Sequence, residues 1–212
     1  ERIARQLEKT GVQSEAGRII RECSSIITAE VESVRTLVDE FSQLAQFPAA
    51  RPGPSDLNEV VESALGVFAG RLDGIEIRRE LAPDLPALLI DREQFKRVVV
   101  NLIDNAAEAM QEALVKRLLI ATQATVADTV ELIVADTGCG VSPEDREKLF
   151  LPYFSTKERG TGLGLAIVAH ILAEHGAQIR VEDNFPTGAR FLVEIPIPQS
   201  LEPEPRPAEA RA

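Results

Sequence analysis

Apolar residues in the first part of the chain recur at a regular helical spacing. They follow one another at about 3.5 residues from Ile20 to Phe47, after a short helical stretch at 1–9. This period predicts two helices joined by a short loop, a helical hairpin over residues 1–47. Because such a hairpin cannot bury its whole apolar stripe alone, we expect it to meet the hairpin of a second copy in a four-helix bundle. The alternative is that the longer helix packs on a globular domain of its own chain.

The pattern changes near residue 50, where prolines 48, 52 and 54 interrupt the helical period. We expect a Pro-rich hinge at 48–55 and a mixed α/β domain over 56–198. Helices are expected at 58–72, 92–112 and 163–175, and strands at 75–81, 87–90, 118–124, 129–135, 179–182 and 189–195. The predicted fold is an α/β sandwich, an open mixed sheet with helices on one face. Residues 199–212 consist mostly of Pro, Glu, Ala and Arg, which predicts a disordered tail.

Composition and charge exclude some classes of partner. A chain of 212 residues that is 44% hydrophobic can bury a sizeable core. Its net charge of -11 gives no general attraction to nucleic acid or to anionic lipid. No apolar run approaches the roughly 18 residues that span a bilayer, and Cys23 and Cys139 resemble free thiols of a reducing compartment. We therefore expect a cytoplasmic fragment without membrane contact of its own, while the full-length protein could be anchored in the inner membrane.

Two asparagines lie one turn apart on the helix predicted at 92–112. Asn101 and Asn105 share one helix face, where a core helix would present aliphatic side chains. Amide oxygens together with ATP phosphates are ligands that Mg²⁺ accepts. An Asn pair alone is also a common capping or core hydrogen-bond feature.

Glycine-rich loops follow the predicted strand 129–135 and precede the predicted helix 163–175. Asp136 could accept the exocyclic amine of adenine while glycines let the backbone approach the ring, although a strand-ending Asp-x-Gly is also a common turn. Alternate glycines at a helix start favour phosphate, although a lone Gly-x-Gly is also a flexible loop. The order of Asn-x-x-x-Asn, Asp-x-Gly-x-Gly, Phe-x-x-x-Phe and Gly-x-Gly-x-Gly along one stretch predicts an ATP site.

In these motifs the chain resembles the ATP-binding domain of sensor histidine kinases, in the ATPase superfamily shared with gyrase, MutL and the ninety-kilodalton heat-shock chaperone. The resemblance covers about residues 56–197. The hairpin at 1–47 resembles the part of the kinase dimerisation domain that follows the phospho-accepting histidine. Residues 38–42, the Pro-rich hinge and residues 150–157 resemble the nitrogen-regulatory kinases of the NtrY and NtrB type.

The resemblance implies a role for each matching position. Asn105 would be the direct Mg²⁺ ligand, and Asn101 a helper near the phosphate or a metal-bound water. Asp136 would hold the adenine amine, with Gly138 and Gly140 shaping its pocket. The phosphates of ATP would be lined by Gly160, Thr161, Gly162, Leu163 and Gly164.

Four further positions are candidates, in the mobile lid that the resemblance implies and near the last strand. Lys157 or Arg159 could neutralise phosphate charge, with Lys157 in a catalytic role, or could be solvated loop charges. Kinases of this family often carry Gly-x-Gly before the last strand, whereas this chain keeps Gly188 alone as a candidate pocket residue. Thr187 could act as a substitute hydrogen-bond donor.

Two departures narrow the chemistry that the resemblance implies. Hydrolytic relatives place a Glu where this chain has Asn101, and an amide cannot accept a proton at neutral pH. The acceptor histidine would lie upstream of Glu1, and we expect His170 and His175 to be structural or surface residues. We therefore expect transfer of the γ-phosphate of Mg-ATP to a histidine outside this chain, for relay to a response regulator. The alternatives are a nucleotide-binding dimerisation scaffold without chemistry of its own, or a related ATPase or serine kinase.

Overall fold

The computed structural model describes residues 18–20, 22–28, 31, 49–156 and 161–198, and the chain divides into two compact units, Glu1–Pro48 and Ala49–Ala212. The described residues of the first unit are helical, as the hydrophobic period predicts. Aliphatic side chains in this unit are exposed: Ile19, Ile20, Ile26, Ile27 and Val31. The rest of the predicted hairpin and the predicted tail lie outside the described residues, so the hairpin and its pairing with a second copy stay predictions.

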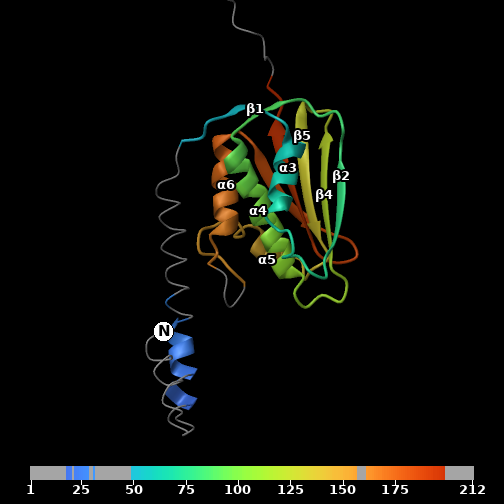
Figure 1. The fold of residues 1–212 in the computed structure, drawn as a ribbon. Helices are drawn as coiled ribbons and strands as arrows, with labels where there is room; N and C mark the ends of the chain where they lie inside the picture. The colour runs from blue at the N-terminus through green and yellow to red at the C-terminus, as the bar shows by residue number, and fades with distance from the viewer. Residues whose placement is uncertain (1–17, 21, 29–30, 32–48, 157–160, 199–212) are drawn as a thin grey trace, which may run out of the picture. The chain divides into compact units, whose positions relative to one another are not determined.

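The second unit is built on a five-stranded mixed sheet (Figure 1). Its strand order is β2-β4-β5-β7-β6, in which β2 runs parallel to β4 and the other neighbours are antiparallel. The strands are β2 (Glu76–Leu81), β4 (Arg117–Ala124), β5 (Thr129–Asp136), β6 (Gln178–Asp183) and β7 (Ala189–Pro196). The expected α/β sandwich is confirmed, and each of these strands lies within two residues of its predicted bounds.

Helices α3 (Leu57–Gly66), α4 (Arg92–Ala109) and α6 (Gly164–Glu174) cover one face of the sheet (Figure 1). Aspartate side chains cap α3 and α4 by accepting first-turn backbone N–H bonds, which fixes where these helices begin. The apolar face of α4, including the fully buried Phe95 and Leu102, packs toward the central strands. Burying such a side chain contributes about 1.5–3 kcal/mol, and this packing holds α4 in a fixed position on the sheet.

The segment expected to be a hinge is partly a strand. Residues 53–55 form β1 (Gly53–Ser55), which pairs antiparallel with β3 (Leu88–Ile90). Pro54 is tolerated because this two-stranded sheet leaves every strand at an edge, where one N–H can be missing. The backbone N–H of Arg51 also donates to Oδ2 of Asp91 at 2.9 Å. The chain from residue 51 onward is therefore attached to the second unit.

Two other expectations differ from the structure. Helix α3 ends at Gly66, not at residue 72, because residues 67–74 form turns that include two glycines with positive φ. A one-turn helix, α5 (Pro143–Arg146), lies within the predicted loop region and is capped by Ser142. No helix in the described ranges is both long and apolar enough to cross a lipid bilayer.

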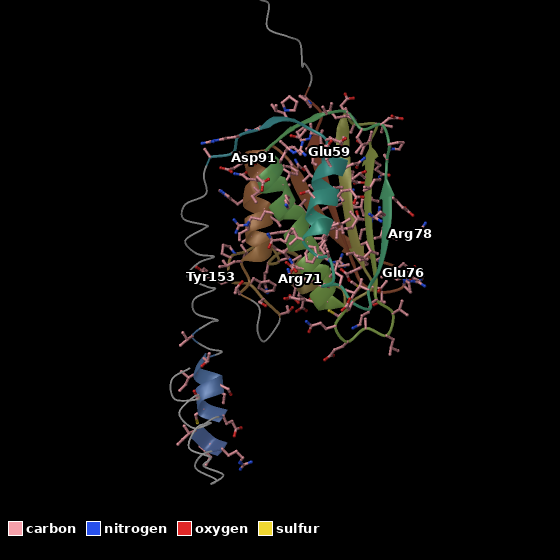
Figure 2. The ribbon with its side chains drawn as sticks, in the orientation of Figure 1. Glu59, Arg71, Glu76, Arg78, Asp91 and Tyr153 are labelled. Carbon is pink, nitrogen blue, oxygen red and sulfur yellow. The ribbon has the colours of Figure 1, made fainter. Side chains whose placement is uncertain are left out.

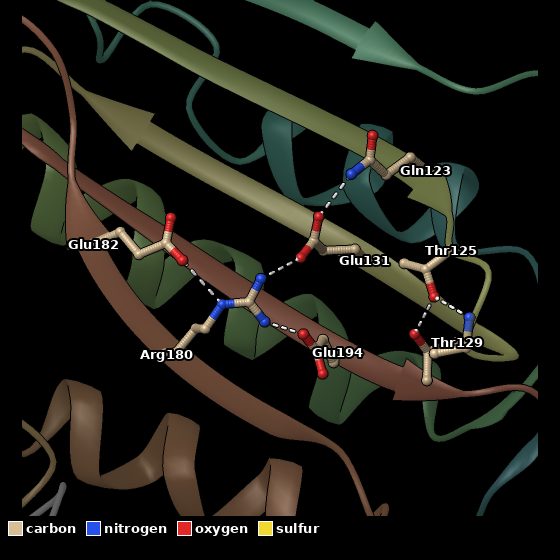
Figure 3. A network of polar contacts seen from close by, with 8 residues as sticks. Gln123, Thr125, Thr129, Glu131, Arg180, Glu182 and Glu194 are labelled. Atoms are coloured by element: carbon tan, nitrogen blue, oxygen red, sulfur yellow. Dashed lines mark hydrogen bonds and ion pairs between the residues drawn. The ribbon is translucent and has the colours of Figure 1, made fainter.

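The sheet face turned away from α3 and α4 carries an ionic network centred on Arg180 (Figure 3). Its guanidinium contacts the carboxylates of Glu131, Glu182 and Glu194. Glu131 is only 5% exposed, and its Oε2 also accepts a 2.7 Å bond from Gln123. A buried carboxylate needs such partners, because leaving its charge unpaired away from water costs several kcal/mol.

Candidate functional site

Helix α4 presents Asn101 and Asn105 on one face, with both NH₂ groups engaged by the helix itself. Nδ2 of Asn101 donates to the carbonyl of Arg97, and Nδ2 of Asn105 donates to the carbonyl of Asn101, each at 2.9 Å. These bonds turn both amide oxygens away from the helix backbone. An amide oxygen is a neutral ligand suited to Mg²⁺ or to a water bound to it, so the residues fit such an ion.

Gly164 places the start of α6 directly against this pair. A Cβ added to Gly164 would lie 3.1 Å from Oδ1 of Asn101 and 3.9 Å from Nδ2 of Asn105. Within the described part of the chain, no side chain caps the first turn of α6, and its N-cap residue is Leu163. The first N–H groups of α6 therefore keep their capacity for an anion beside the side-chain amides of Asn101 and Asn105.

Asp136 ends β5 and is 1% exposed. Its Oδ1 accepts backbone N–H bonds from Gly138 at 2.8 Å and from Ala189 at 3.3 Å. These two donors come from different strand ends and fix the carboxylate in one orientation. A fixed buried carboxylate is suited to recognise an amine of a ligand.

Close backbone contacts require glycine on both sides of Asp136. A Cβ on Gly138 would lie 2.5 Å from the carbonyl oxygen of Ala109, at the end of α4. Gly188 has a φ of 110°, and a Cβ there would lie 1.9 Å from the carbonyl oxygen of Asp136. Gly140 lies against Gly188, since its Cβ would be 3.2 Å from the Gly188 oxygen. The structure thus brings the predicted Gly138, Gly140 and Gly188 together around Asp136.

A backbone hydrogen bond joins the two described sides of the predicted lid, before residue 157 and after residue 160. The backbone N–H of Tyr153 donates to the carbonyl of Gly162 at 3.0 Å, and both residues have positive φ. Thr161 is half-buried, whereas the side chain of Leu163 is fully buried, so only its backbone is placed to face a ligand. Three predicted site residues, Lys157, Arg159 and Gly160, lie outside the described residues.

The far ends of α4 and α6 are joined by His175, which has a structural role. Its Nε2 accepts the backbone N–H of Asp91 at 3.0 Å, and its Nδ1 lies 2.7 Å from the carbonyl of Ile171. The ring also meets Phe95 edge-on, with ring centroids 4.9 Å apart. Figure 2 shows Asp91 at one end of the helix layer and Tyr153 at the other, beside the start of α6.

Two carboxyl groups, that of the α4 N-cap residue Asp91 and that of Asp104 within α4, have shifted pKa values. Burial raises the pKa of Asp91, but hydrogen bonds from the backbone N–H groups of Arg51, Gln94 and Glu93 outweigh it, so the pKa is lowered overall. Burial raises the pKa of Asp104, and the nearby charge of Glu108 adds to this, while Arg71 opposes it. Folding therefore favours the ionised form of Asp91 and the protonated form of Asp104 relative to a free aspartate.

Two residues of the β6–β7 loop contact the Asp136 segment, and only one of them, Thr187, was predicted from the sequence. Nδ2 of Asn184 donates to the carbonyl of Asp136 at 2.7 Å, and the hydroxyl of Thr187 donates to the carbonyl of Gly138 at 3.0 Å. Thr187, expected as a substitute donor, thus bonds to the protein's own loop. The available signal for Asn184 was an amide directly after a strand and before a Phe-Pro turn.

Comparison with known proteins gives the family. Residues 90–199 match the family described as Histidine kinase-, DNA gyrase B-, and HSP90-like ATPase. The C4-dicarboxylate transport sensor protein DctB of Rhizobium meliloti is 37% identical over 168 residues, which are 77% of this chain and 26% of DctB. Nitrogen regulation protein NtrY of Azorhizobium caulinodans is 31% identical over 189 residues, which are 86% of this chain and 24% of NtrY. The chain thus spans about a quarter of the length of these curated relatives.

Solved structures give the same relationship. Full-length ShkA in complex with AMPPNP has a TM-score of 0.68 and 30% identity, covering 82% of this chain and 39% of ShkA. Histidine kinase ThkA in complex with response regulator protein TrrA has a TM-score of 0.71 and 25% identity, covering 92% of this chain and 57% of that chain. The family match, the sensor-protein relatives and the shared architecture lead to one conclusion. This chain belongs to the histidine kinase-, DNA gyrase B- and HSP90-like ATPase family, in its sensor histidine kinase branch.

Proposed function

We propose that the second unit binds Mg-ATP between α4, the Asp136 loop and the start of α6, and donates the γ-phosphate to a histidine outside this chain. The contact of Gly164 with Asn101 carries the proposal, because it sets an uncapped helix start beside the amide oxygen of Asn101 and the amide group of Asn105. Ala109 lies two turns further along the same helix face, and its carbonyl accepts the N–H of Cys139 at 3.2 Å. From Asn101 to Ala109 the helix axis advances about 12 Å, a span suited to an extended nucleoside triphosphate.

Residues at the two ends of this helix face would bind different parts of the nucleotide. Asp136 would accept the adenine amine, while Gly138 and Gly188 let the surrounding backbone close on the ring. Asn105 would hold Mg²⁺ directly, and Asn101 would hold a phosphate oxygen or a metal-bound water. When bound, the ion would neutralise charge on the phosphate oxygens during transfer. For Lys157 and Arg159 we keep the proposal that they add positive charge to the lid.

Transfer to a protein nucleophile is favoured over hydrolysis. No carboxylate stands at the position of Asn101, so the side chain there orients but does not abstract a proton. Catalysis would then rest on positioning and charge neutralisation. A relative of this chain is described in complex with a response regulator, which supports the proposal that the phosphate passes on to such a protein. We also propose that the hairpin at 1–47 pairs with that of a second copy to form a dimer. The chain would belong to the nitrogen-regulatory branch of these kinases, and its catalytic domain would span residues 56–198.

Calorimetric titration with ATP, with and without Mg²⁺, tests the site. Asp136→Asn keeps the size of the side chain but removes the charged acceptor, a change of about 1.5–3 kcal/mol, and should weaken ATP binding at least tenfold. Asn105→Ala should abolish the dependence of ATP affinity on Mg²⁺. Gln123→Ala, on the opposite face of the sheet, is the control and should bind as the unmodified protein does. Unchanged affinity in Asp136→Asn would remove Asp136 from the site.

A further inference from the structure

We infer that Asn184, assisted by Thr187, is a positioning residue that sets the Asp136 carboxylate for recognition of the adenine amine. The inference deepens the proposed function and rests on it. Neither residue needs to touch the nucleotide, because both act on the backbone that carries Asp136.

The β6–β7 loop is bonded to both ends of the segment that contains Asp136. Nδ2 of Asn184 donates to the carbonyl of Asp136 at 2.7 Å, and the hydroxyl of Thr187 donates to the carbonyl of Gly138 at 3.0 Å. The loop closes on itself through the N–H of Asn184, which donates to the carbonyl of Gly188 at 3.0 Å. The two side chains therefore form a clamp, defined here as Asn184 and Thr187, around the Asp136 loop.

The clamp begins where the strand ladder stops. Pairing between β5 and β7 runs from Thr129 opposite Pro196 to Ala135 opposite Arg190, so Asp136 lies one residue beyond the last pair. On this side, Asp136 is held by Asn184 and by the N–H of Ala189 on its Oδ1. The β5–β7 ladder secures the fold up to Ala135, and β4 pairs with Asp136 through Leu118, so the bond from Asn184 holds Asp136 on the β7 side.

Close packing transmits any movement of the loop to the carboxylate. The backbone of Gly188 lies so near Asp136 that a Cβ would be 1.9 Å from its carbonyl oxygen. Ala189, the next residue, supplies one of the two N–H groups that orient Oδ1. If the bond from Asn184 is lost, the first residues of β7 can move away and take that N–H with them. The direction of the carboxylate, and with it the preference for an amine at that position, should then relax.

Nucleotide selectivity distinguishes positioning from a structural role. Inosine triphosphate carries an oxygen where ATP carries the exocyclic amine, so the ratio of its Kd to that of ATP reports on the Asp136 contact. In Asn184→Ala, with Mg²⁺ present, we expect the Kd for ATP to rise about five- to twentyfold and the Kd for inosine triphosphate to change less than threefold. Gln178→Ala removes an exposed amide at the other end of β6 and serves as the matched control.

Variants of Thr187 provide a second, independent test, which applies even if Asn184→Ala fails to fold. Thr187→Val should lower the selectivity ratio, and Thr187→Ser, which keeps the hydroxyl, should restore it. If the ratio stays at the unmodified value in folded Asn184→Ala or Thr187→Val, the positioning role is overturned. Equal weakening of both nucleotides with a lower melting temperature also overturns it, in favour of a structural role. A ratio that responds to Asp136→Asn but not to the clamp variants overturns this inference alone, whereas absence of ATP binding in the unmodified protein overturns the proposed function with it.

Discussion

Gly188→Ala perturbs the closest backbone contact around the candidate site. The new Cβ would lie 1.9 Å from the carbonyl oxygen of Asp136, whereas an unstrained carbon-to-oxygen contact is about 3.3 Å. Relief of the clash requires β7 and β5 to separate by about 1.4 Å at this point, the difference between those two distances. The φ of 110° adds strain, because L side chains rarely adopt it.

The cost of this substitution is the sum of two terms. Overpacking in a closed interior costs about 1–3 kcal/mol, and unfavourable backbone strain costs about 1–3 kcal/mol more. The free energy of unfolding should fall by about 2–6 kcal/mol, which lowers the melting temperature by roughly 5–20 °C in a domain of about 150 residues. Separation by more than 1 Å would also carry Ala189 away from Oδ1 of Asp136, so ATP binding should weaken in the protein that remains folded.

Thermal unfolding followed by circular dichroism measures the first effect, and calorimetric titration with ATP measures the second. Gly66→Ala is the matched control, since Gly66 ends α3 with no atom within 4 Å of its added Cβ. This control should be neutral or stabilising by up to about 1 kcal/mol, because alanine favours helix. A Gly188→Ala protein that melts with the unmodified protein and binds ATP equally well would refute the packing argument.

Three further substitutions have defined outcomes. Asp91→Ala should lower the free energy of unfolding by about 1–2 kcal/mol at pH 7, because the N-cap of α4 is lost. Folding lowers the pKa of Asp91, so this contribution exists above pH about 4 and disappears as the pH falls through the folded pKa. Urea unfolding at pH 7 and pH 3 should show the difference from the unmodified protein closing, and a constant difference would speak against it. Arg180→Ala should lower the free energy of unfolding by about 1–3 kcal/mol, because the buried Glu131 loses its cation. The affinity for ATP should stay unchanged, and a reduced affinity would contradict a nucleotide site confined to the other face of the sheet. Gly164→Ala should raise the Kd for Mg-ATP several-fold by displacing the Asn101 amide, with little loss of stability, and an unaltered Kd would place the phosphates elsewhere.

Hydrophobic period was enough to predict the strands of the five-stranded sheet, β3 and helices α3, α4 and α6, but not β1, α5 or how the strands pair. Strands β4 and β5 were predicted within a residue because their apolar runs are bounded by polar turns. The parallel neighbour β2 is exposed along nearly its whole length, so its burial pattern gave no indication of its place at the sheet edge. The pairing of β1 with β3 was missed because three prolines dominate that segment, while the partner strand lies more than 30 residues away.

The candidate site was predictable where spacing along one element defines it. Asn101 and Asn105 are one turn apart, so their shared face follows from helix geometry alone. The tight contact of Gly138 with Ala109 and the bond from Asn184 to Asp136 join segments distant in sequence, and only the packing of α4 and β7 on β5 creates them. Sequence patterns thus indicated the groups that we propose to recognise the ligand, whereas the groups that we infer to position them required the structure.

The central claim, donation of phosphate to a protein histidine, is tested most directly by labelled ATP and a longer chain that includes the helix that we propose upstream of Glu1. We predict label on the protein that is stable in base and lost in acid, as expected of phosphohistidine, and its disappearance in Asn105→Ala. Release of free phosphate without labelled protein would contradict the proposed kinase and favour an ATPase. ATP binding with neither product would contradict it in favour of a scaffold without chemistry of its own.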